Sequence, residues 1–152
     1  AWLNLGAVVD DGRDLTARRE MLAAALNAGL ASEKGYGGIE AAAFGLEATT
    51  KTTYGVLHGA LLAEVMDFNA PAVTDRSDAI RTTLGLSSRA DFAEELTLFA
   101  ERIGLPTRLS DVGVAAPHLP NAALRAAADP ANRTNPRYAT ASDYEQIMRA
   151  VL

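Results

Sequence analysis

The chain has 152 residues, a net charge of −5, no cysteine, and a hydrophobic content of 49% with only 6% aromatic residues. The length predicts one domain over residues 1–152, and the lack of cysteine excludes disulfides and thiolate catalysis. No basic stripe indicates nucleic acid and no apolar run is long enough to cross a bilayer, so we expect a cytoplasmic protein without nucleic-acid or membrane partners.

The apolar pattern predicts about eight helices and no strand. Valine and isoleucine are scattered and form no strand-like run, whereas the many alanines favour helices that pack closely through small side chains. In chain order we expect helices over 2–10, 15–34, 39–48, 56–68, 71–84, 89–103, 119–129 and 143–152. The segment 56–68 is apolar on nearly every side, which is typical of a buried helix.

Helix starts are predicted from capping residues. The expected starts are Asp14 as a cap, Pro71 in a first turn, Ser88 with Asp91 as a capping box, and Ser142 with Glu145. The stretch PANRTNPR (130–137) predicts an ordered loop held by asparagine and proline, with the alternative that Arg133 and Arg137 face an anionic ligand. GYGG (35–38) follows a helix rather than a strand, so it is a weak match to a dinucleotide-binding fingerprint.

Four stretches, in this order, resemble the C-terminal helical domain of the iron-containing alcohol dehydrogenase family: DGRDLTARREMLAAALNAGLA, GALLAEVMDFNAPA, IGLPTRLSDVGV and DPANRTNPR. The resemblance runs from about Leu5 to Leu152 and implies an all-α orthogonal helical bundle. It also implies an N-terminal nucleotide-binding domain for NAD(P), which is absent from this chain. The family holds a divalent metal, usually iron or zinc, with an aspartate and three histidines, and the aspartate and first histidine lie upstream of this chain.

The resemblance maps the remaining ligands through a family pattern of H-x3-H followed, ten residues later, by H-G. We anchor the alignment on Val65–Asn69 and extend it towards the N-terminus without a gap. Glu40 and Phe44 then take the H-x3-H positions, and Tyr54 takes the position of the next ligand histidine. His58 then falls four positions after that ligand. In an alternative alignment His58-Gly59 is the family H-G, at the cost of a four-residue insertion and a compensating deletion.

These substitutions leave fewer good metal ligands than a catalytic site of this kind needs. Glu40 can still bind a hard ion, but Tyr54 is a poor ligand near neutral pH because an unperturbed phenol has a pKa of about 10. We therefore expect no metal site of the family's kind. Tyr54 and Phe44 either fill the volume left by the ion, or Tyr54 acts as a general acid with Lys51 three residues before it.

The remaining candidates also have two interpretations each. Glu40 is either an acid favoured at a helix start or a pocket residue, and His58, one turn beyond Tyr54, is either a hydrogen-bonded core histidine or a pocket residue. His118 lies between prolines and is expected in a surface loop.

Two functions are therefore predicted. In the first, the chain is the substrate-side domain of an NAD(P)-dependent, alcohol dehydrogenase-like oxidoreductase, with Tyr54 and His58 as catalytic residues and Glu40 and Phe44 beside them in the substrate pocket. It would be inactive without a nucleotide-binding domain or subunit. In the alternative, it is a non-catalytic scaffold or assembly subunit. In both, we expect a homo- or hetero-oligomer, because the alanine-rich first helices would otherwise leave an apolar face exposed.

Overall fold

The computed structural model describes residues 1–87 and 91–152, and within these ranges it contains eight α-helices, four short 3-10 helices and no strand. The all-α prediction is confirmed. Contacts divide the chain into two compact units, Ala1–Gly35 and Tyr36–Leu152, and the single domain over 1–152 stays a prediction. Among the described residues, no helix is long and apolar enough to cross a membrane.

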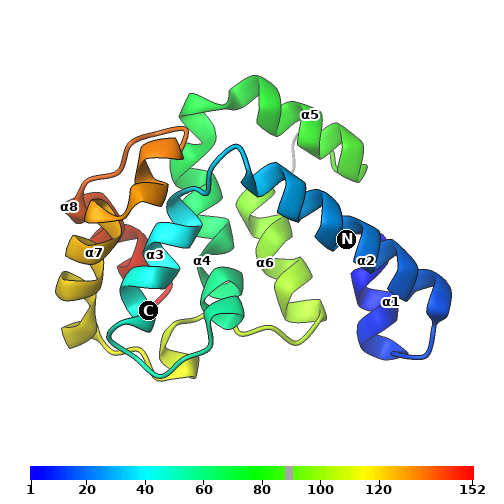
Figure 1. Ribbon diagram of the computed structural model, residues 1–152, viewed down its shortest axis with the longest axis horizontal. Helices are drawn as coiled ribbons and strands as arrows, with labels where there is room; N and C mark the ends of the chain where they lie inside the picture. The colour runs from blue at the N-terminus through cyan, green and yellow to red at the C-terminus, as the bar shows by residue number, and fades with distance from the viewer. Residues whose placement is uncertain (88–90) are drawn as a thin grey trace. The chain divides into compact units, whose positions relative to one another are not determined.

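The first unit is a helical hairpin of α1 (Leu5–Asp10) and α2 (Leu15–Ser32), which contact each other (Figure 1). Asp14 caps α2 as predicted, because its carboxylate accepts hydrogen bonds from the backbone N–H groups of Thr16 and Ala17, both at 3.0 Å. Ala17 is the buried residue of α2. The hairpin therefore has almost no core of its own.

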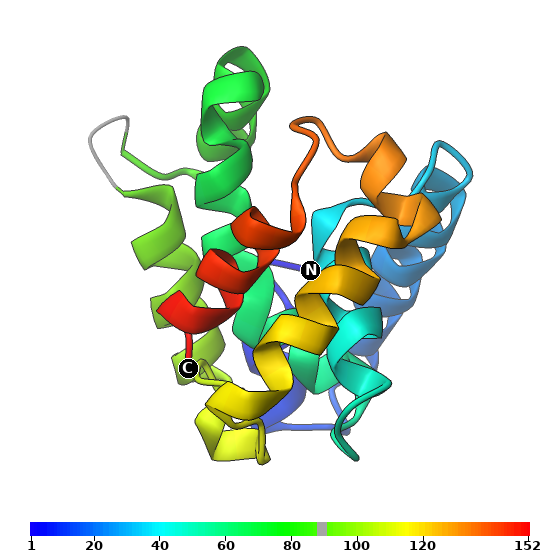
Figure 2. The same cartoon turned by 90° about the vertical axis from the view of Figure 1, so that its left-hand side faces the viewer.

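The second unit is a helical bundle around α4. Its helices are α3 (Gly38–Glu47), α4 (Tyr54–Asn69), α5 (Thr74–Leu84), α6 (Phe92–Arg102), α7 (Leu119–Ala128) and α8 (Ala141–Ala150). Helix α4 contacts α3, α6 and α8, while α7 packs against both α3 and α8 (Figures 1 and 2). The largest fully buried side chains include Leu46, Leu57, Leu61, Tyr144 and Met148.

Close packing through small residues is clearest where α3 crosses α7. A Cβ atom added to Gly45 would lie 2.3 Å from the carbonyl oxygen of Ala122, so only glycine allows this approach. Alanines of both helices, such as Ala42 and Ala123, are buried in the same layer. The small-residue packing predicted from composition is confirmed here.

Two predicted helix starts are wrong. Pro71 lies in the 3-10 turn η1 (Ala70–Ala72), which directly continues α4, and α5 begins only at Thr74. Helix α8 is capped two residues earlier than predicted. Thr140 accepts from the N–H of Asp143 at 3.2 Å and Asp143 accepts from the N–H of Thr140 at 2.8 Å. Two capping pairs with the same spacing are available here, Thr140 with Asp143 and Ser142 with Glu145. The helix starts at the pair that comes first in the chain.

The capping box predicted for α6 is only partly described. Ser88 lies outside the described residues. Asp91 is itself the cap, since its carboxylate accepts from the N–H groups of Ala93 at 2.9 Å and Glu94 at 3.2 Å.

The predicted ordered loop is confirmed, and asparagines hold it. It contains the 3-10 helix η4 (Pro130–Thr134). Asn132 donates to the carbonyl of Ala139 at 2.8 Å and accepts from the Tyr144 hydroxyl at 3.0 Å. Burial raises the pKa of the Tyr144 phenol, which keeps it a hydrogen-bond donor. Arg137 stacks 4.0 Å from the ring centre of Phe68, so it is engaged within the fold.

Candidate functional site

Helices α3 and α4 bring three of the four predicted site residues together. Glu40 lies in the first turn of α3, Tyr54 is the first residue of α4, and His58 follows one turn later. The Glu40 Oε2 and His58 Nε2 atoms are 3.3 Å apart. The rings of Tyr54 and His58 have centres 4.1 Å apart with an interplanar angle of 51°.

The start of α3 is fixed by a pair of asparagines, Asn135 of the predicted loop and Asn69 of α4, whose long-range contact no sequence pattern indicated. Asn135 Oδ1 accepts from the N–H of Gly38 at 2.9 Å and from Asn69 Nδ2 at 3.0 Å, and Asn135 Nδ2 donates to Asn69 Oδ1 at 2.8 Å. A Cβ atom at Gly38 would lie 3.1 Å from Asn135 Oδ1. The loop thus ties the start of α3 to the end of α4, and Glu40 follows Gly38 by two residues.

The start of α4 is fixed by the threonine-rich connector. The hydroxyls of Thr49 and Thr50 donate to the carbonyl of Leu46, at 2.9 and 3.0 Å, and close the end of α3. The Thr52 hydroxyl donates to the carbonyl of Val112. These bonds place Tyr54 and His58 opposite Glu40.

Glu40 and His58 are partly exposed, with side-chain exposures of 25% and 29%. His58 is therefore neither a core histidine nor a freely solvated one. Glu40 contacts His58 across the two helices, although its place in the first turn also suits the helix dipole. Phe44, one turn beyond Glu40, is 51% exposed, and His118 accepts a hydrogen bond from the N–H of Ala115 at 3.0 Å in the 3-10 helix η3 (Ala116–His118).

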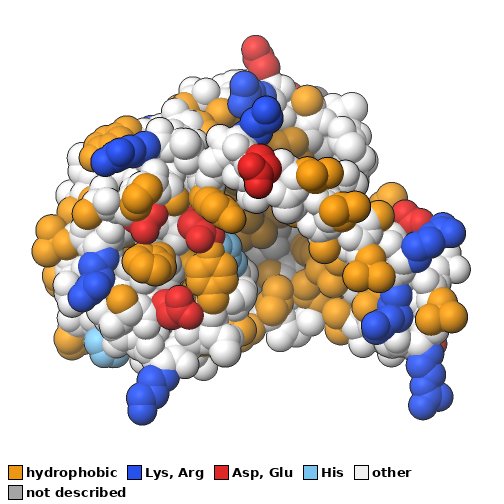
Figure 3. Space-filling model, in the orientation of Figure 1, with side chains coloured by type: hydrophobic (Ala, Val, Ile, Leu, Met, Phe, Trp, Pro, Cys, Tyr) orange, Lys and Arg blue, Asp and Glu red, His pale blue; other side chains and the backbone are white. Residues whose placement is uncertain are grey.

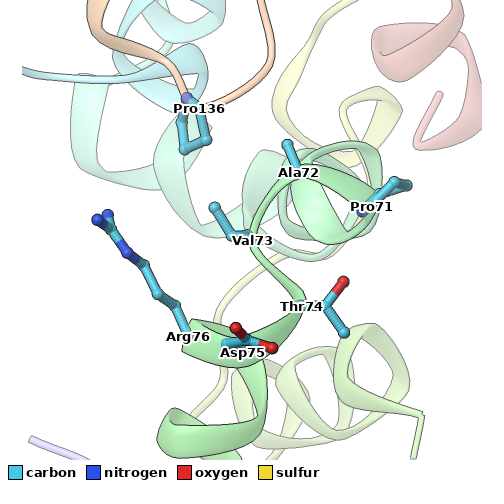
Figure 4. A pocket seen from close by; sticks show the side chains of 7 residues that line it. All are labelled: Pro71, Ala72, Val73, Thr74, Asp75, Arg76 and Pro136. Carbon is cyan, nitrogen blue, oxygen red and sulfur yellow. The ribbon is translucent and has the colours of Figure 1, made fainter.

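A cavity of about 760 Å³ adjoins the start of α4 and is lined by Lys51, Thr53 and Val56, among other residues. Two other cavities lie elsewhere. One of about 580 Å³ is formed by η1, the first residues of α5 and Pro136, with Asp75 and Arg76 as its charged residues (Figure 4). Another, of about 510 Å³, lies between the end of α4 and α8 and contains Glu64. Burial, and secondarily the charge of Asp67, raises the pKa of Glu64. The predicted substrate pocket around Glu40, Phe44, Tyr54 and His58 stays a prediction.

The described residues contain neither a three-ligand metal group nor a dinucleotide fingerprint. No group of three His, Cys, Asp or Glu side chains is close enough to hold a metal in the part of the chain that the structure describes. Glu40 Oε2 and His58 Nε2 are two atoms of metal-ligating type 3.3 Å apart, and the Phe44 ring offers no donor atom. GYGG connects α2 to α3, and without a preceding strand it has no phosphate-binding context.

The comparisons with known proteins agree with this fold. Residues 2–152 match the C-terminal domain of the Fe-containing alcohol dehydrogenase family. The chain belongs to this family. Its helical bundle is similar to a 1,3-propanediol oxidoreductase structure, with a TM-score of 0.93, 29% identity and 99% of this chain covered. The alcohol dehydrogenase from Oenococcus oeni gives a TM-score of 0.90 at 26% identity over 99% of this chain. The predicted orthogonal bundle is confirmed.

Curated members of the Fe-containing alcohol dehydrogenase family are longer than this chain. The 4-hydroxybutyrate dehydrogenase of Cupriavidus necator is 30% identical over 97% of this chain and 41% of its own length. The probable alcohol dehydrogenase EutG of Escherichia coli K12 is 33% identical over 95% of this chain and 37% of its own length. The NAD-dependent methanol dehydrogenase of Bacillus methanolicus is 29% identical over 97% of this chain and 41% of its own length. The chain thus spans about two fifths of the relatives it matches.

Proposed function

We propose that this chain is the substrate-side domain of an NAD(P)-dependent, alcohol dehydrogenase-like oxidoreductase in which Glu40, His58 and Tyr54 perform the acid–base work that a metal assists elsewhere in the family. The observation that supports this most directly is the contact between Glu40 and His58 with Tyr54 beside it. Three polar side chains converge at positions that the resemblance assigns to, or near, metal ligands.

Two contacts of His58 bear on where a proton would lie in a hydrogen bond with Glu40. Its Nδ1 atom lies 3.0 Å from the carbonyl oxygen of Tyr54, and a carbonyl can only accept, so Nδ1 carries a proton. At Nε2, 3.3 Å from the Glu40 carboxyl, a hydrogen bond needs one further proton, either on the imidazole or on the carboxyl. The pair is thus arranged to share one proton.

A shared proton suits the chemistry of alcohol–carbonyl exchange. When an alcohol is oxidised, its carbon gives up a hydride and its oxygen gives up a proton, and the reverse reaction returns both. A nicotinamide held by the second domain would accept the hydride. In oxidation the Glu40–His58 pair would take the proton, and in reduction the Tyr54 phenol would donate one to the carbonyl oxygen, a contribution typically worth about 10²–10⁴-fold in rate. The isolated chain, without a nucleotide-binding domain, would be inactive.

The test uses the longer enzyme, assayed for NAD(P)-dependent oxidation of short primary alcohols and reduction of the matching aldehydes. Tyr54→Phe and His58→Asn should each lower kcat/KM by about 10²-fold or more, while metal analysis of the active enzyme should find less than stoichiometric iron or zinc. His118→Asn changes the other histidine and serves as the matched control, with activity within about twofold. Activity that depends on a bound metal, or that survives both substitutions, would disprove this role.

A scaffold without catalysis is the second candidate, and Phe44 favours it. A half-exposed phenyl ring occupies one of the two H-x3-H positions, where it can supply neither a ligand nor a proton. Native mass spectrometry of the protein with its natural partners would show which chains and nucleotides it binds. Turnover by the 152-residue chain alone would refute the scaffold proposal.

A further inference from the structure

One side of α3 carries two carboxyl groups with a phenyl ring between them. At 100° per residue, Glu40, Phe44 and Glu47 lie within about 60° of the helix circumference. The Phe44 ring is 51% exposed and Glu47 is exposed, while Glu40 is the carboxyl that contacts His58. We call these three residues the α3 stripe. All of it lies in the second unit, beside the proposed acid–base residues.

The two helices that form the site carry negative charge and no positive charge. Helix α3 contains Glu40 and Glu47, helix α4 contains Glu64 and Asp67, and neither helix contains a lysine or an arginine. Figure 3 shows acidic and hydrophobic side chains together at the surface over α3. Lys51 of the connector lines the cavity of about 760 Å³ at the start of α4, and no residue of the α3 stripe lines that cavity.

The carboxyl of Glu47 is available to a bound molecule. It forms no hydrogen bond or ion pair with another residue in the part of the chain that the structure describes. A positive charge attached to a substrate would therefore be attracted to Glu47, and a substrate carboxylate would be repelled. The exposed Phe44 ring adds to this selectivity, because the face of an aromatic ring attracts ammonium groups.

The spacing of the α3 stripe sets the length of a substrate that can use it. At a rise of 1.5 Å per residue, Phe44 lies about 6 Å and Glu47 about 10 Å along the helix from Glu40. His58 contacts Glu40, so the hydroxyl that reacts would lie at that end of the stripe. A chain of about four carbons would then carry a terminal ammonium to the Phe44 ring, within the roughly 6 Å over which a cation–π interaction acts, and towards Glu47.

We propose that the site takes amino alcohols, with the hydroxyl at the Glu40–His58 pair and the ammonium held by Phe44 and Glu47. This inference rests on the proposed function, because it names the substrate class of the same site. Oxidation moves a hydride from the hydroxyl-bearing carbon to the nicotinamide and the hydroxyl proton to the pair. The product is the amino aldehyde, and the ammonium group is unchanged.

The test is NAD(P)-dependent oxidation, by the longer enzyme, of three substrates of equal length: 4-amino-1-butanol, 1,4-butanediol and 4-hydroxybutyrate. A unit charge about 6 Å from a carboxylate changes binding by about threefold at a dielectric constant of 80 and by about a hundredfold at 20. We expect kcat/KM to decrease in the order given, with at least about tenfold between the amino alcohol and the hydroxy acid. Added salt should reduce that ratio.

Two substitutions assign the preference to Glu47. Glu47→Lys should raise kcat/KM for the hydroxy acid relative to the amino alcohol by at least about tenfold, and oxidation of the uncharged diol reports any general effect on folding or catalysis. Glu101→Lys makes the same change of charge at an exposed position of α6 and is the matched control. It should leave the ratio within about twofold, because salt screens distant exposed charges.

The possible failures are distinguishable. An active enzyme that oxidises the hydroxy acid as well as the amino alcohol, or whose ratio is the same in Glu47→Lys, would overturn this inference and leave the proposed function standing. The same conclusion follows if the enzyme oxidises other primary alcohols and none of these three. Absence of turnover with every alcohol tested would overturn the proposed function and this inference together.

Discussion

Replacing Asn135 by alanine should destabilise the second unit strongly. Asn135 is 9% exposed and its side chain forms four hydrogen bonds: with the Gly38 N–H, with both amide atoms of Asn69, and with the Arg137 carbonyl at 2.6 Å. Each such bond contributes about 1 kcal/mol net, and buried groups left without a partner cost more. Because some water can enter at the loop, we expect a loss of about 3–4 kcal/mol in the free energy of unfolding.

The assay is urea unfolding followed by circular dichroism at 222 nm. Asn135→Asp keeps the two acceptor interactions of Oδ1 and loses the two donors, so it should fall between the wild type and alanine. Asn121→Ala, an exposed amide on α7, is the control and should change stability by less than about 0.5 kcal/mol. A loss below about 1 kcal/mol for Asn135→Ala would refute the argument that this amide ties α3 to α4.

Further substitutions test single contacts. Gly45→Ala should lower the free energy of unfolding by about 2 kcal/mol or more, because its Cβ would overlap the Ala122 carbonyl. Gly55→Ala has open space around it and should raise the free energy of unfolding by about 0.5–1 kcal/mol in the same assay. Thr140→Ala should cost about 1 kcal/mol through loss of the α8 cap. The hydrogen bonds from Thr140 lower the pKa of Asp143. The stability that they add is therefore present above the ordinary carboxyl pKa and is lost as the pH falls through the lowered pKa. Thr140→Ala should make the free energy of unfolding less dependent on pH in this acidic range. The raised pKa of Glu64 has the opposite effect on stability. Its carboxylate destabilises the fold as the pH rises above the ordinary glutamate pKa, so Glu64→Gln should increase the free energy of unfolding at pH 7 and not at pH 4.

Local patterns were enough to predict most of the fold. The Asp14 cap and the helices expected over 15–34 and 89–103 each depend on residues close in sequence, and the structure has that cap and the helices α2 and α6 in those places. At Ser142 two capping pairs of the same spacing compete, and at Pro71 the chain continues α4 through the 3-10 turn η1 before α5 begins at Thr74. In both cases the outcome depends on which neighbouring residues continue a turn, and single-residue preferences do not decide that.

The candidate site could be predicted only in part because its key contacts are long-range. Glu40 and His58 were both singled out, but nothing in their spacing showed that a carboxyl on α3 would face an imidazole on α4 at 3.3 Å. That contact depends on Asn135, which is 97 residues from Gly38, and on Asn69, 66 residues from Asn135. In the sequence, an asparagine in a loop is typical of a turn residue. Its role in linking two helices is visible only in the folded structure.

The link from Asn135 to Glu40 also bears on the choice between enzyme and scaffold. A scaffold needs α3 and α4 to pack, and the buried alanines with Leu46 and Leu57 achieve that without any polar residue at 40 or 58. The Glu40–His58 contact is partly exposed, and an exposed ion pair adds little stability, about 0–1 kcal/mol. Its contribution to folding is therefore too small to account for a carboxyl, an imidazole and a phenol converging at one place. The proposed function predicts that Glu40→Gln, which removes the charge at nearly constant volume, reduces turnover of the longer enzyme far more than it reduces stability.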